Sequence, residues 1–458
     1  MTVAGSGFRP FRGCAMRRLK WVFCSSLLLV TLLWLFAEPG LVDTRGFFNW
    51  RSLAVQLSGL LAMTCMGLAM LLALRPRWLE QRLDGLDKMY RLHKWLGIGA
   101  LVISVMHWLA AKGPKWAVGW GWLERPQKGP GAAQQSLEAF FTSQRGNAES
   151  LGEWAFYAMV ILLALALIKR IPYRLFYQTH RVMAVTYVVL VAHSLVLLKF
   201  SYWSTPIGWL TGALLAVGTW VAVISLLRRI GDQRQIPGQI TGLHYYPEVK
   251  SLEVQTRVPA WPGHKPGQFA FVTSDSREGF HPYTIASDWR PDNPQITFVV
   301  KALGDHTRTL PEQLKVGQPV TVEGPYGCFT FEDLRPRQIW IGGGIGVTPF
   351  VARLKHLAAH PGEDQHVDFF HSTSEVDEQA LARLADDVDD TNVRMHLLIS
   401  ARDGYLTAER IRALVPDWRE ASIWFCGPAG FGETLRRDFA ALGFPVHRHF
   451  HQEMFAMR

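Results

Sequence analysis

The first half of the chain contains six apolar runs that carry no charged residue. They are Trp21–Ala37, Ser52–Leu74, Trp95–Ala111, Trp154–Ile168, Val182–Leu198 and Trp203–Leu227. A helix needs about 20 apolar residues to cross the hydrocarbon core of a bilayer, or about 17 when flanking side chains reach the interface. The pattern therefore predicts six transmembrane helices. For the first run a signal peptide is the alternative interpretation, because Arg17, Arg18 and Lys20 precede it, but no small-residue cleavage site follows.

Basic residues are concentrated in every second connection between these runs. They precede the first run and recur between the second and third, between the fourth and fifth, and after the sixth. Lys and Arg mark the cytoplasmic side of membrane proteins. We therefore expect a multi-pass protein of the cell (inner) membrane, with the N-terminus and the C-terminal half in the cytoplasm and the long connection 112–153 outside.

Composition argues against several other classes of function. Most of the net charge of +10 lies beside the apolar runs, and no long Lys/Arg tract has interleaved aromatic residues, so no nucleic-acid partner is expected. The cysteines are scattered and form no C-x-x-C pair, which argues against a zinc site, a disulfide framework and an iron–sulfur cluster. They are Cys14, Cys24, Cys65, Cys328 and Cys426.

The hydrophobic pattern changes after Ile236-Pro237-Gly238. Short β-rich runs such as 269–273 and 295–300 follow, broken by Pro, Gly and Asp. From about Arg337, strand-like and helix-like runs alternate, which indicates a parallel α/β domain. The predicted fold is a multi-domain membrane protein: a six-helix transmembrane bundle over 1–235, an antiparallel β-barrel over 236–335 and a parallel α/β domain over 336–458.

Four histidines lie in or beside two of the predicted helices. His93 and His107 are 14 residues apart at the third run, and His180 and His193 are 13 apart at the fifth. Ionisable residues inside a membrane are costly and indicate function by default, although a single one is often only a packing residue. Each pair spans roughly 20 Å of helix, and the two helices cross in the same direction. His93 is therefore expected level with His180, and His107 with His193, so that each level can ligate a haem iron from both sides.

Two details of these helices stay open at this stage. On an ideal helix, 13 residues end about 140° away from the starting face, and nothing in the sequence explains how His180 and His193 both reach their partners. Tyr187 lies between these two histidines and is interpreted as a packing residue, with assistance to electron transfer as the alternative.

The C-terminal half contains motifs suited to nucleotide cofactors. In His281–Ser287 an aromatic residue, Tyr283, offers a face for an isoalloxazine ring beside two hydroxyls. Lys301–Thr307 places a glycine, a cation and a hydroxyl where a diphosphate can rest. The glycine-rich turn Ile341–Pro349 joins an apolar strand to a helix, the arrangement in which backbone N–H groups approach a diphosphate. Cys426-Gly427-Pro428 ends a later strand, at the sheet edge where ligands bind.

The order of these motifs resembles the ferredoxin–NADP reductase superfamily. Together with the four histidines, the chain from about residue 52 onward resembles the ferric reductase/NADPH oxidase family of transmembrane flavocytochromes. The resemblance implies FAD in the β-barrel domain, NAD(P)H in the α/β domain, and two b-type haems. The implied axial ligands are His93, His107, His180 and His193.

The same resemblance assigns the remaining site residues. FAD would be held by His281, Pro282, Tyr283, Thr284 and Ser287, with Gly304 and Thr307 near its diphosphate. NAD(P)H would be held by Gly342, Gly344, Gly346, Thr348 and Pro349, with Cys426, Gly427 and Pro428 beside the nicotinamide. The expected catalytic residues are Thr284, Cys426 and Phe455, the last as the C-terminal aromatic that shields the flavin. Three residues follow Phe455, which departs from the family pattern.

The reaction expected from this resemblance moves electrons from cytoplasmic NAD(P)H through FAD and two haems to an acceptor outside the membrane. A ferric chelate is the favoured acceptor, and the tryptophans Trp116, Trp120 and Trp122 are expected to cover its site. Alternatives are a superoxide-producing NADPH oxidase, transfer to a periplasmic protein, and, in another class, a non-enzymatic haem sensor or scaffold. NADPH is preferred over NADH only because Arg402 is placed to pair with a 2′-phosphate.

Overall fold

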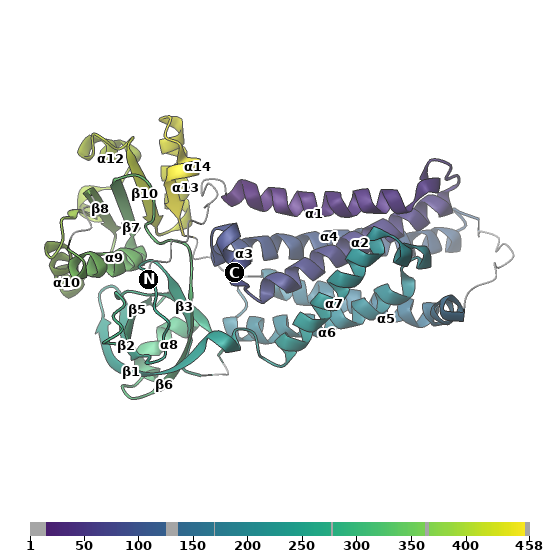
Figure 1. The fold of residues 1–458 in the computed structure, drawn as a ribbon, viewed down its shortest axis with the longest axis horizontal. Helices are drawn as coiled ribbons and strands as arrows, with labels where there is room; N and C mark the ends of the chain where they lie inside the picture. Colours follow the sequence, from purple (N-terminus) through teal and green to yellow (C-terminus); the bar gives the residue numbers. More distant parts are fainter. Residues whose placement is uncertain (1–14, 125–135, 169, 276–277, 362–365, 454–458) are drawn as a thin grey trace, which may run out of the picture. The chain divides into compact units, whose positions relative to one another are not determined.

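The structure is a computed structural model that describes residues 15–124, 136–168, 170–275, 278–361 and 366–453 (Figure 1). The chain divides into two compact units. The first, here called the membrane unit, contains Arg17–Pro76 and Met89–Ile230. The second, called the reductase unit after the expectation stated above, contains Arg77–Lys88 and, among the described residues, 231–453.

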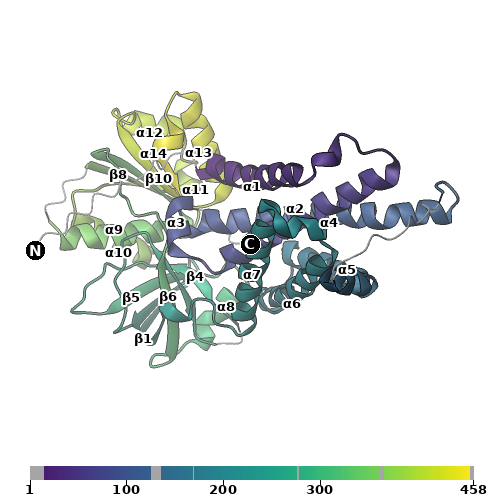
Figure 2. The same cartoon turned by 45° about the vertical axis from the view of Figure 1, so that its right-hand side comes forward.

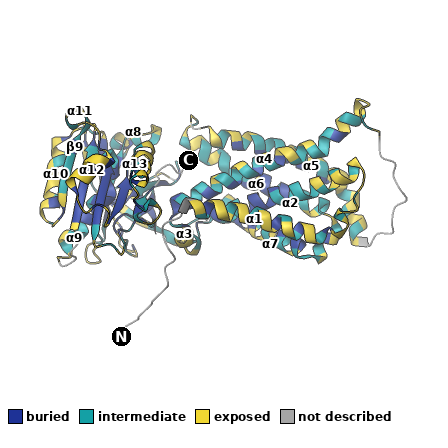
Figure 3. Ribbon diagram, turned by 90° about the horizontal axis from the view of Figure 1, so that it is seen from above, coloured by how far each residue is buried: buried dark blue, intermediate teal, exposed yellow. Residues whose placement is uncertain are grey.

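Six helices of the described chain are long and apolar enough to cross a membrane, as the apolar runs predict. They are α1 (Ala15–Ala37), α2 (Phe47–Ala73), α4 (Leu86–Gly119), α5 (Ser136–Leu167), α6 (Tyr173–Leu197) and α7 (Pro206–Leu226), with the short 3₁₀ helices η1 (Pro39–Leu41) and η2 (Phe200–Ser204) beside them. Large apolar side chains such as Trp21, Trp154 and Trp220 are exposed on these helices. Figure 3 shows exposed residues, in yellow, along α1 and α4. Such surfaces suit lipid rather than water. The orientation of the helices stays a prediction.

The C-terminal part of α4 is held to α2 by an arginine. Pro114 lies inside α4 and has no N–H, so the carbonyl of Ala110 lacks its usual helical partner. Arg51 of α2 supplies one, because its Nε donates to the Ala110 carbonyl at 3.0 Å and its Nη2 donates to the Ala111 carbonyl at 2.8 Å. The guanidinium thereby satisfies a polar group that the apolar surroundings would otherwise leave unpaired.

Tyr187 of α6 is a packing residue in the centre of the bundle. Its side chain is buried, and its hydroxyl donates to the carbonyl of Leu214 on α7 at 3.3 Å. A Cβ atom at Gly218 would lie only 2.0 Å from that hydroxyl oxygen. The ring therefore needs a glycine on the facing helix, as small residues allow close helix packing in membranes.

The first lobe of the reductase unit is an antiparallel sheet. Its elements are η3 (Asp232–Arg234), β1 (Gln235–Tyr246), β2 (Ser251–Arg257), β3 (Phe269–Thr273), β4 (His281–Thr284), β5 (Gln295–Lys301), α8 (Asp305–Gln313) and β6 (Pro319–Tyr326), with α3 (Arg77–Leu83) in the same unit. The strand order is β4-β3-β6-β1-β2-β5. The predicted barrel is not closed: the edge strands meet only at the isolated bridge Ile285–Phe298. β4 has four residues and contains Pro282, which has no N–H to donate, so it supports few ladder hydrogen bonds.

The second lobe is the predicted parallel α/β domain. Its elements are β7 (Arg337–Gly343), η4 (Gly344–Val347), α9 (Thr348–Ala359), β8 (His366–Thr373), α10 (Glu378–Asp389), β9 (Arg394–Ile399), α11 (Ser400–Asp403), α12 (Ala408–Leu414), β10 (Ala421–Cys426), α13 (Ala429–Ala441), α14 (Val446–His449) and β11 (Phe450–Gln452). The order is β11-β10-β7-β8-β9, and every pairing is parallel. Alternate residues of β7 pack on opposite sides of the sheet, Ile339 and Ile341 toward α12 and α13 and Trp340 toward α9 and α10. Figure 2 shows α12 and α13 on one side of β8 and β10, and α9 and α10 on the other.

Two ion pairs and a histidine–carboxylate hydrogen bond cross the seam between the two lobes. Arg383 of α10 donates to the buried carboxylate of Glu253 on β2 at 2.8 Å. Lys301 at the end of β5 pairs with Glu375, and His356 of α9 contacts Asp288 at 2.8 Å. These contacts fix the distance between the segments that carry the two sets of cofactor motifs.

Gly218→Ala should lower the stability of the membrane unit, because the new Cβ collides with the Tyr187 hydroxyl. Overpacking of this kind costs roughly 1–3 kcal/mol. The measurement is the temperature midpoint of unfolding in detergent. Gly212→Ala on the same helix is the control, since its Cβ would lie 3.4 Å from Trp203, an ordinary contact. Equal midpoints for the two variants would contradict the prediction.

Candidate functional site

The membrane unit brings the four histidines together in two pairs, as the sequence predicts. The rings of His93 on α4 and His180 on α6 have centroids 6.0 Å apart with an interplanar angle of 68°. The rings of His107 and His193, on the same two helices, are 6.4 Å apart at 81°. α6 is a continuous α-helix that contains both His180 and His193. A break in this helix is therefore not the reason that two histidines 13 residues apart both reach partners on α4.

Backbone carbonyls of neighbouring helices hold three of these rings by Nδ1. His93 lies 2.9 Å from the Ala69 carbonyl of α2, His107 lies 3.1 Å from the Val55 carbonyl, and His193 lies 2.8 Å from the Ala148 carbonyl of α5. A carbonyl only accepts, so Nδ1 must carry the proton and Nε2 of the neutral ring carries the lone pair. This is the arrangement in which a histidine serves as a metal ligand. His180 has no hydrogen bond at Nδ1 within the described chain, and its ring stacks on Phe176.

A glycine makes room for His193. A Cβ at Gly152 of α5 would lie 2.0 Å from Nδ1 of His193. His107 and His193 line a partly open cavity. Its rim carries four basic and two acidic side chains: Arg51, Lys112, Lys115, Arg145, Glu149 and Glu153. Trp108 lines the same cavity, and its ring lies 5.3 Å from that of Trp116, which brings one of the three predicted covering tryptophans near the site.

In the reductase unit, the His281–Ser287 segment forms β4 and the turn after it. His281 and Thr284 are buried, and Tyr283 packs near Phe298 of β5. The Ser287 hydroxyl accepts a hydrogen bond from the Thr297 N–H at 3.1 Å. The backbone carbonyl of Ser287 accepts a hydrogen bond from Nε2 of His264 at 2.9 Å. His264 was not predicted, and nothing in the sequence around it distinguishes it.

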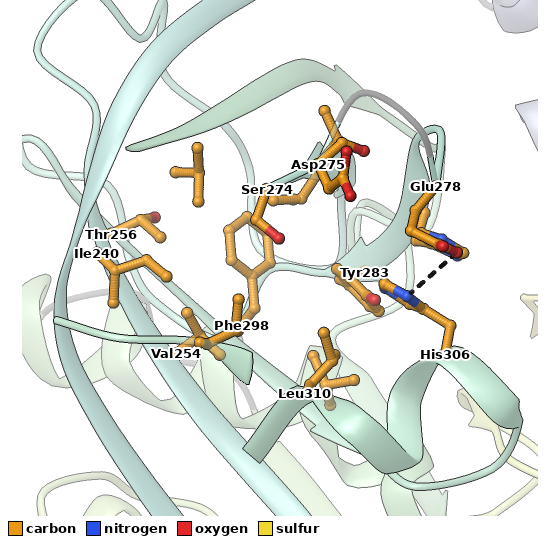
Figure 4. A pocket seen from close by; sticks show the side chains of 16 residues that line it. Ile240, Val254, Thr256, Ser274, Asp275, Glu278, Tyr283, Phe298, His306 and Leu310 are labelled. Atoms are coloured by element: carbon orange, nitrogen blue, oxygen red, sulfur yellow. Dashed lines mark hydrogen bonds and ion pairs between the residues drawn. The ribbon is translucent and has the colours of Figure 1, made fainter. Parts of the chain in front are cut away.

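The imidazole of His281 stacks on His306 of α8, with centroids 3.8 Å apart and nearly parallel planes. Burial, followed by the neighbouring His306, lowers the pKa of His281 to about 3, so the ring is neutral at physiological pH. Both rings line a cavity of about 470 Å³, with Glu278 within 4.0 Å of His306 and Tyr283 beside them (Figure 4).

The Gly304–Thr307 loop is organised by its own threonine. The Thr307 hydroxyl accepts from the N–H groups of Leu303 and Gly304 at 3.0 Å each, and it donates to the Gly304 carbonyl at 3.2 Å. These contacts use the full capacity of a hydroxyl. Thr307 thus shapes the loop, while contact of Gly304 with a diphosphate stays a prediction.

The glycine-rich turn lies against the Cys426-Gly427-Pro428 segment, because β7 and β10 are adjacent and parallel. A Cβ at Gly346 would lie 2.2 Å from the Cys426 carbonyl oxygen, so this glycine allows close packing of the two segments. Gly344 differs: its φ is +55° and no atom lies near its Cβ position. Of the turn's glycines, Gly344 is the one best placed to face a ligand, and Thr348 and Pro349 open α9 behind it.

Cys426 is buried, and its neighbour in the reductase unit is a carboxyl group that was not predicted as a site residue. Burial and then the nearby Glu453 raise the pKa of the Cys426 thiol, which stays protonated. Burial and then Asp87 raise the pKa of Glu453 to about 8, against the opposing effect of Lys88. The sequence marks Glu453 only by its place before Phe455, and Phe455 itself lies outside the described residues.

The structure weakens the argument for NADPH over NADH, which rests on Arg402 being free to pair with a 2′-phosphate. Arg402 lies in α11, and its guanidinium donates to both carboxylate oxygens of the adjacent Asp403, at 2.9 and 3.0 Å. A bidentate pair of this kind already uses the face that would bind a phosphate.

Comparison with known families matches both halves of this arrangement. The family described as "Ferric reductase like transmembrane component" matches residues 58–191, and "FAD-binding domain" matches residues 242–330. The first match contains all of His93, His107 and His180, and the second contains the His281–Ser287 segment.

Curated relatives include plant oxidases and bacterial reductase components. The chain is 24% identical over 314 residues to "Ferric reduction oxidase 8, mitochondrial" of Arabidopsis thaliana, covering 66% of this chain and 39% of the relative. It is 28% identical over 219 residues to "Respiratory burst oxidase homolog protein E" of the same plant, which covers 42% of this chain and 22% of the relative. It is also 28% identical over 211 residues to a "Glycine betaine monooxygenase reductase subunit" of Chromohalobacter salexigens, covering 42% and 56%.

The chain thus spans a little over half the length of the first curated relatives. Among solved structures, the FAD/NAD-binding domain of a Vibrio cholerae nitric oxide dioxygenase covers 48% of this chain and 97% of its own, at 20% identity and a TM-score of 0.41. That likeness is too weak to define the fold, which rests on the strand pairings given above. The chain thus carries a match to a ferric reductase-like transmembrane component followed by a match to an FAD-binding domain, and it is similar to oxidoreductases of the ferric reductase and NADPH oxidase type.

Proposed function

We propose that this protein moves electrons from cytoplasmic NAD(P)H through FAD and two b-type haems to an acceptor on the other side of the membrane, and that the acceptor is a ferric chelate. The N-terminus and the reductase unit lie in the cytoplasm in this proposal. The similarity to two plant proteins, a ferric reduction oxidase and a respiratory burst oxidase homolog, agrees with electron transfer of this general type.

The ring geometry of the two histidine pairs carries the proposal. Two imidazoles whose nitrogens each lie about 2 Å from one metal have ring centroids roughly 6 Å apart. The observed separations are 6.0 and 6.4 Å. His93, His107 and His193 are also held in the tautomer that a ligand requires. Packing alone gives no reason for both features to occur at two levels of the same two helices.

The cofactors supply the redox chemistry: flavin accepts a hydride and haem carries single electrons. The chain's own residues bind and orient these groups. His281, Pro282, Tyr283, Thr284 and Ser287 would hold FAD, with Gly304 near its diphosphate. Gly342, Gly344, Gly346, Thr348 and Pro349 would hold NAD(P)H, with Cys426, Gly427 and Pro428 beside the nicotinamide. Cys426 stays a neutral thiol and Glu453 keeps its proton up to about pH 8, so neither puts a negative charge beside the ring at neutral pH.

The rim of the outer cavity supports an anionic acceptor. Basic side chains outnumber acidic ones there by four to two. Lys112 pairs with Glu153, and Lys115 and Arg145 share Glu149, so these side chains together with Arg51 leave a net charge of +2 at the cavity. A ferric chelate with carboxylate groups would be attracted to such a rim, whereas neutral oxygen would not.

The decisive experiment is anaerobic spectroscopy of the detergent-purified protein after addition of NADPH or NADH. We expect flavin bleaching followed by reduced b-type haem bands, and we expect His93→Ala and His180→Ala each to lose roughly half of the haem, because each removes one ligand of the same pair. Ferric citrate added afterwards should reoxidise the haem faster than oxygen does.

Two results would count against the proposal. Flavin reduction without bound haem would make the protein a membrane-tethered flavin reductase. Faster reoxidation by oxygen, with superoxide as the product, would replace the ferric chelate by oxygen as the acceptor.

Gly152→Ala should disturb the outer histidine pair, because the new Cβ would lie 2.0 Å from Nδ1 of His193. We expect roughly half of the haem to be lost, with the remaining haem at the His93–His180 level. Gly146→Ala on the same helix has no atom within 4 Å of its Cβ and should keep the full haem content. The measurement is the ratio of haem to protein, and equal ratios in the two variants would argue against a ligand role for His193.

Glu453→Gln should flatten the pH dependence of stability in the reductase unit. The pKa of Glu453 rises from 4.5 to about 8 in the fold, so the folded state binds the proton more tightly and stability falls as pH increases from about 4.5 to 8. The midpoint temperature of flavin release should therefore be lower at pH 9 than at pH 6 in the unsubstituted protein, by several degrees. If the midpoint of Glu453→Gln falls between pH 6 and pH 9 as much as that of the unsubstituted protein, the Glu453 carboxyl is not the cause of the pH dependence.

A further inference from the structure

The adenosine half of a nicotinamide coenzyme would lie over the ends of β8 and β9. In the function proposed above, on which this inference rests, the diphosphate binds at the glycine-rich turn after β7 and the nicotinamide lies beside Cys426, at the end of β10. β10 and β8 flank β7 on opposite sides, and β9 lies beyond β8. Neighbouring strands are about 4.8 Å apart. A dinucleotide that extends across this edge of the sheet therefore carries its adenosine ribose toward the residues that follow β9.

The segment that follows β9 carries an acidic and a basic side chain that bind each other. Nε and Nη2 of Arg402 donate to Oδ1 and Oδ2 of Asp403 at 2.9 and 3.0 Å. The backbone N–H of Ile399, the last residue of β9, also donates to Oδ2, at 2.9 Å. The Asp403 side chain is 25% exposed and that of Arg402 is 65% exposed. The carboxylate is thus attached to the end of the strand, and the guanidinium is attached to the carboxylate.

The Asp403 carboxylate is ionised and can still accept a hydrogen bond. Hydrogen bonds from Arg402 and then from the Ile399 N–H lower the pKa of Asp403. A carboxylate offers about four lone-pair sites, and the three hydrogen bonds described above leave one of them on Oδ1. A ribose hydroxyl can donate to this site. A 2′-phosphate carries a charge of about −1.5 to −2 at pH 7 and would be repelled there.

Another basic side chain beside this turn is engaged by the backbone. Nη1 of Arg410, in the first turn of α12, donates to the carbonyls of Asp403 and Tyr405. These bonds hold the turn around Gly404, whose φ is +71°. Arg410 therefore helps to fix the position of Asp403, and its guanidinium faces carbonyl oxygens of the chain.

We propose that the electron donor is NADH and that Asp403 selects it by accepting a hydrogen bond from the 2′-hydroxyl of the adenosine ribose. In nucleotide-binding α/β folds an acidic side chain binds this hydroxyl of NAD, whereas an arginine accommodates the 2′-phosphate of NADP. Both residue types are present here, but the acid holds the arginine. NADPH would have to displace Arg402 from Asp403 and place its phosphate beside the carboxylate, which weakens its binding relative to that of NADH.

The test compares two ligands that carry the distinguishing part of each coenzyme without its redox chemistry. ADP-ribose lacks the 2′-phosphate, and 2′-phospho-ADP-ribose contains it. Isothermal titration calorimetry of the full, FAD-containing chain in detergent should show about tenfold tighter binding of ADP-ribose, because close like charges repel each other even in water. In anaerobic flavin reduction, NADH should be effective at correspondingly lower concentrations than NADPH.

Asp403→Asn keeps the shape of the side chain, removes its charge and releases Arg402. We expect this variant to bind 2′-phospho-ADP-ribose about tenfold more tightly than the unsubstituted chain does. Arg402→Gln alone should keep the preference for ADP-ribose, because Asp403 remains. Arg402→Gln added to Asp403→Asn should remove the gain in affinity for the phosphorylated ligand.

Glu420→Gln is the matched control. It removes an exposed carboxylate just before β10, at the amino end of the strand, and should leave the ratio of the two affinities unchanged. Retained FAD absorbance shows that each variant is folded. The choice of NADH alone is overturned if the unsubstituted chain binds 2′-phospho-ADP-ribose at least as tightly as ADP-ribose, or if Asp403→Asn leaves the ratio unchanged. An FAD-containing chain that binds neither ligand would overturn the proposed function and the choice of coenzyme together.

Discussion

Hydrogen bonds from histidine Nδ1 atoms to backbone carbonyls organise the membrane unit. A carbonyl in the interior of a helix already accepts one bond from its own helix, and its second lone pair is available to a neighbour. His93, His107 and His193 each use such a carbonyl on a helix other than their own. These bonds fix the ring positions and the proton positions together. They also explain why α2 and α5, which carry none of the four histidines, are required around α4 and α6.

Much of this arrangement could be predicted from the sequence, for a physical reason. Six apolar runs and four histidines at spacings of 14 and 13 are properties of single helices, and a bilayer allows few ways to combine them. The carbonyl partners could not be predicted, because every residue offers a carbonyl and only the packed bundle selects Ala69, Val55 and Ala148. The same holds for Gly152 and Gly218, whose importance depends on the side chain that faces them.

In the reductase unit, prediction succeeded for contiguous motifs and failed for contacts between distant segments. The glycine-rich turn and the parallel sheet are local patterns and were found. The barrel was expected to close, but β4 is too short and contains a proline. Thr307 looked like a diphosphate ligand because the sequence shows its hydroxyl but not the two N–H groups that already occupy it. Glu453 gains its unusual environment only when chain segments far apart in sequence bury it.

The hydrogen bonds from Arg51 to the carbonyls before Pro114 determine which changes of sequence the C-terminal end of α4 can tolerate. A proline inside a helix is usually a hinge, and motion there would reach His107 two turns earlier in the same helix. Arg51 holds the carbonyls on the histidine side of the proline, at Ala110 and Ala111. The part of α4 after Pro114 can therefore change in length, sequence or tilt while His107 keeps its position. In engineering terms, the extension of α4 beyond Pro114 is a replaceable module, which can be redesigned without rebuilding the histidine pair of His107 and His193.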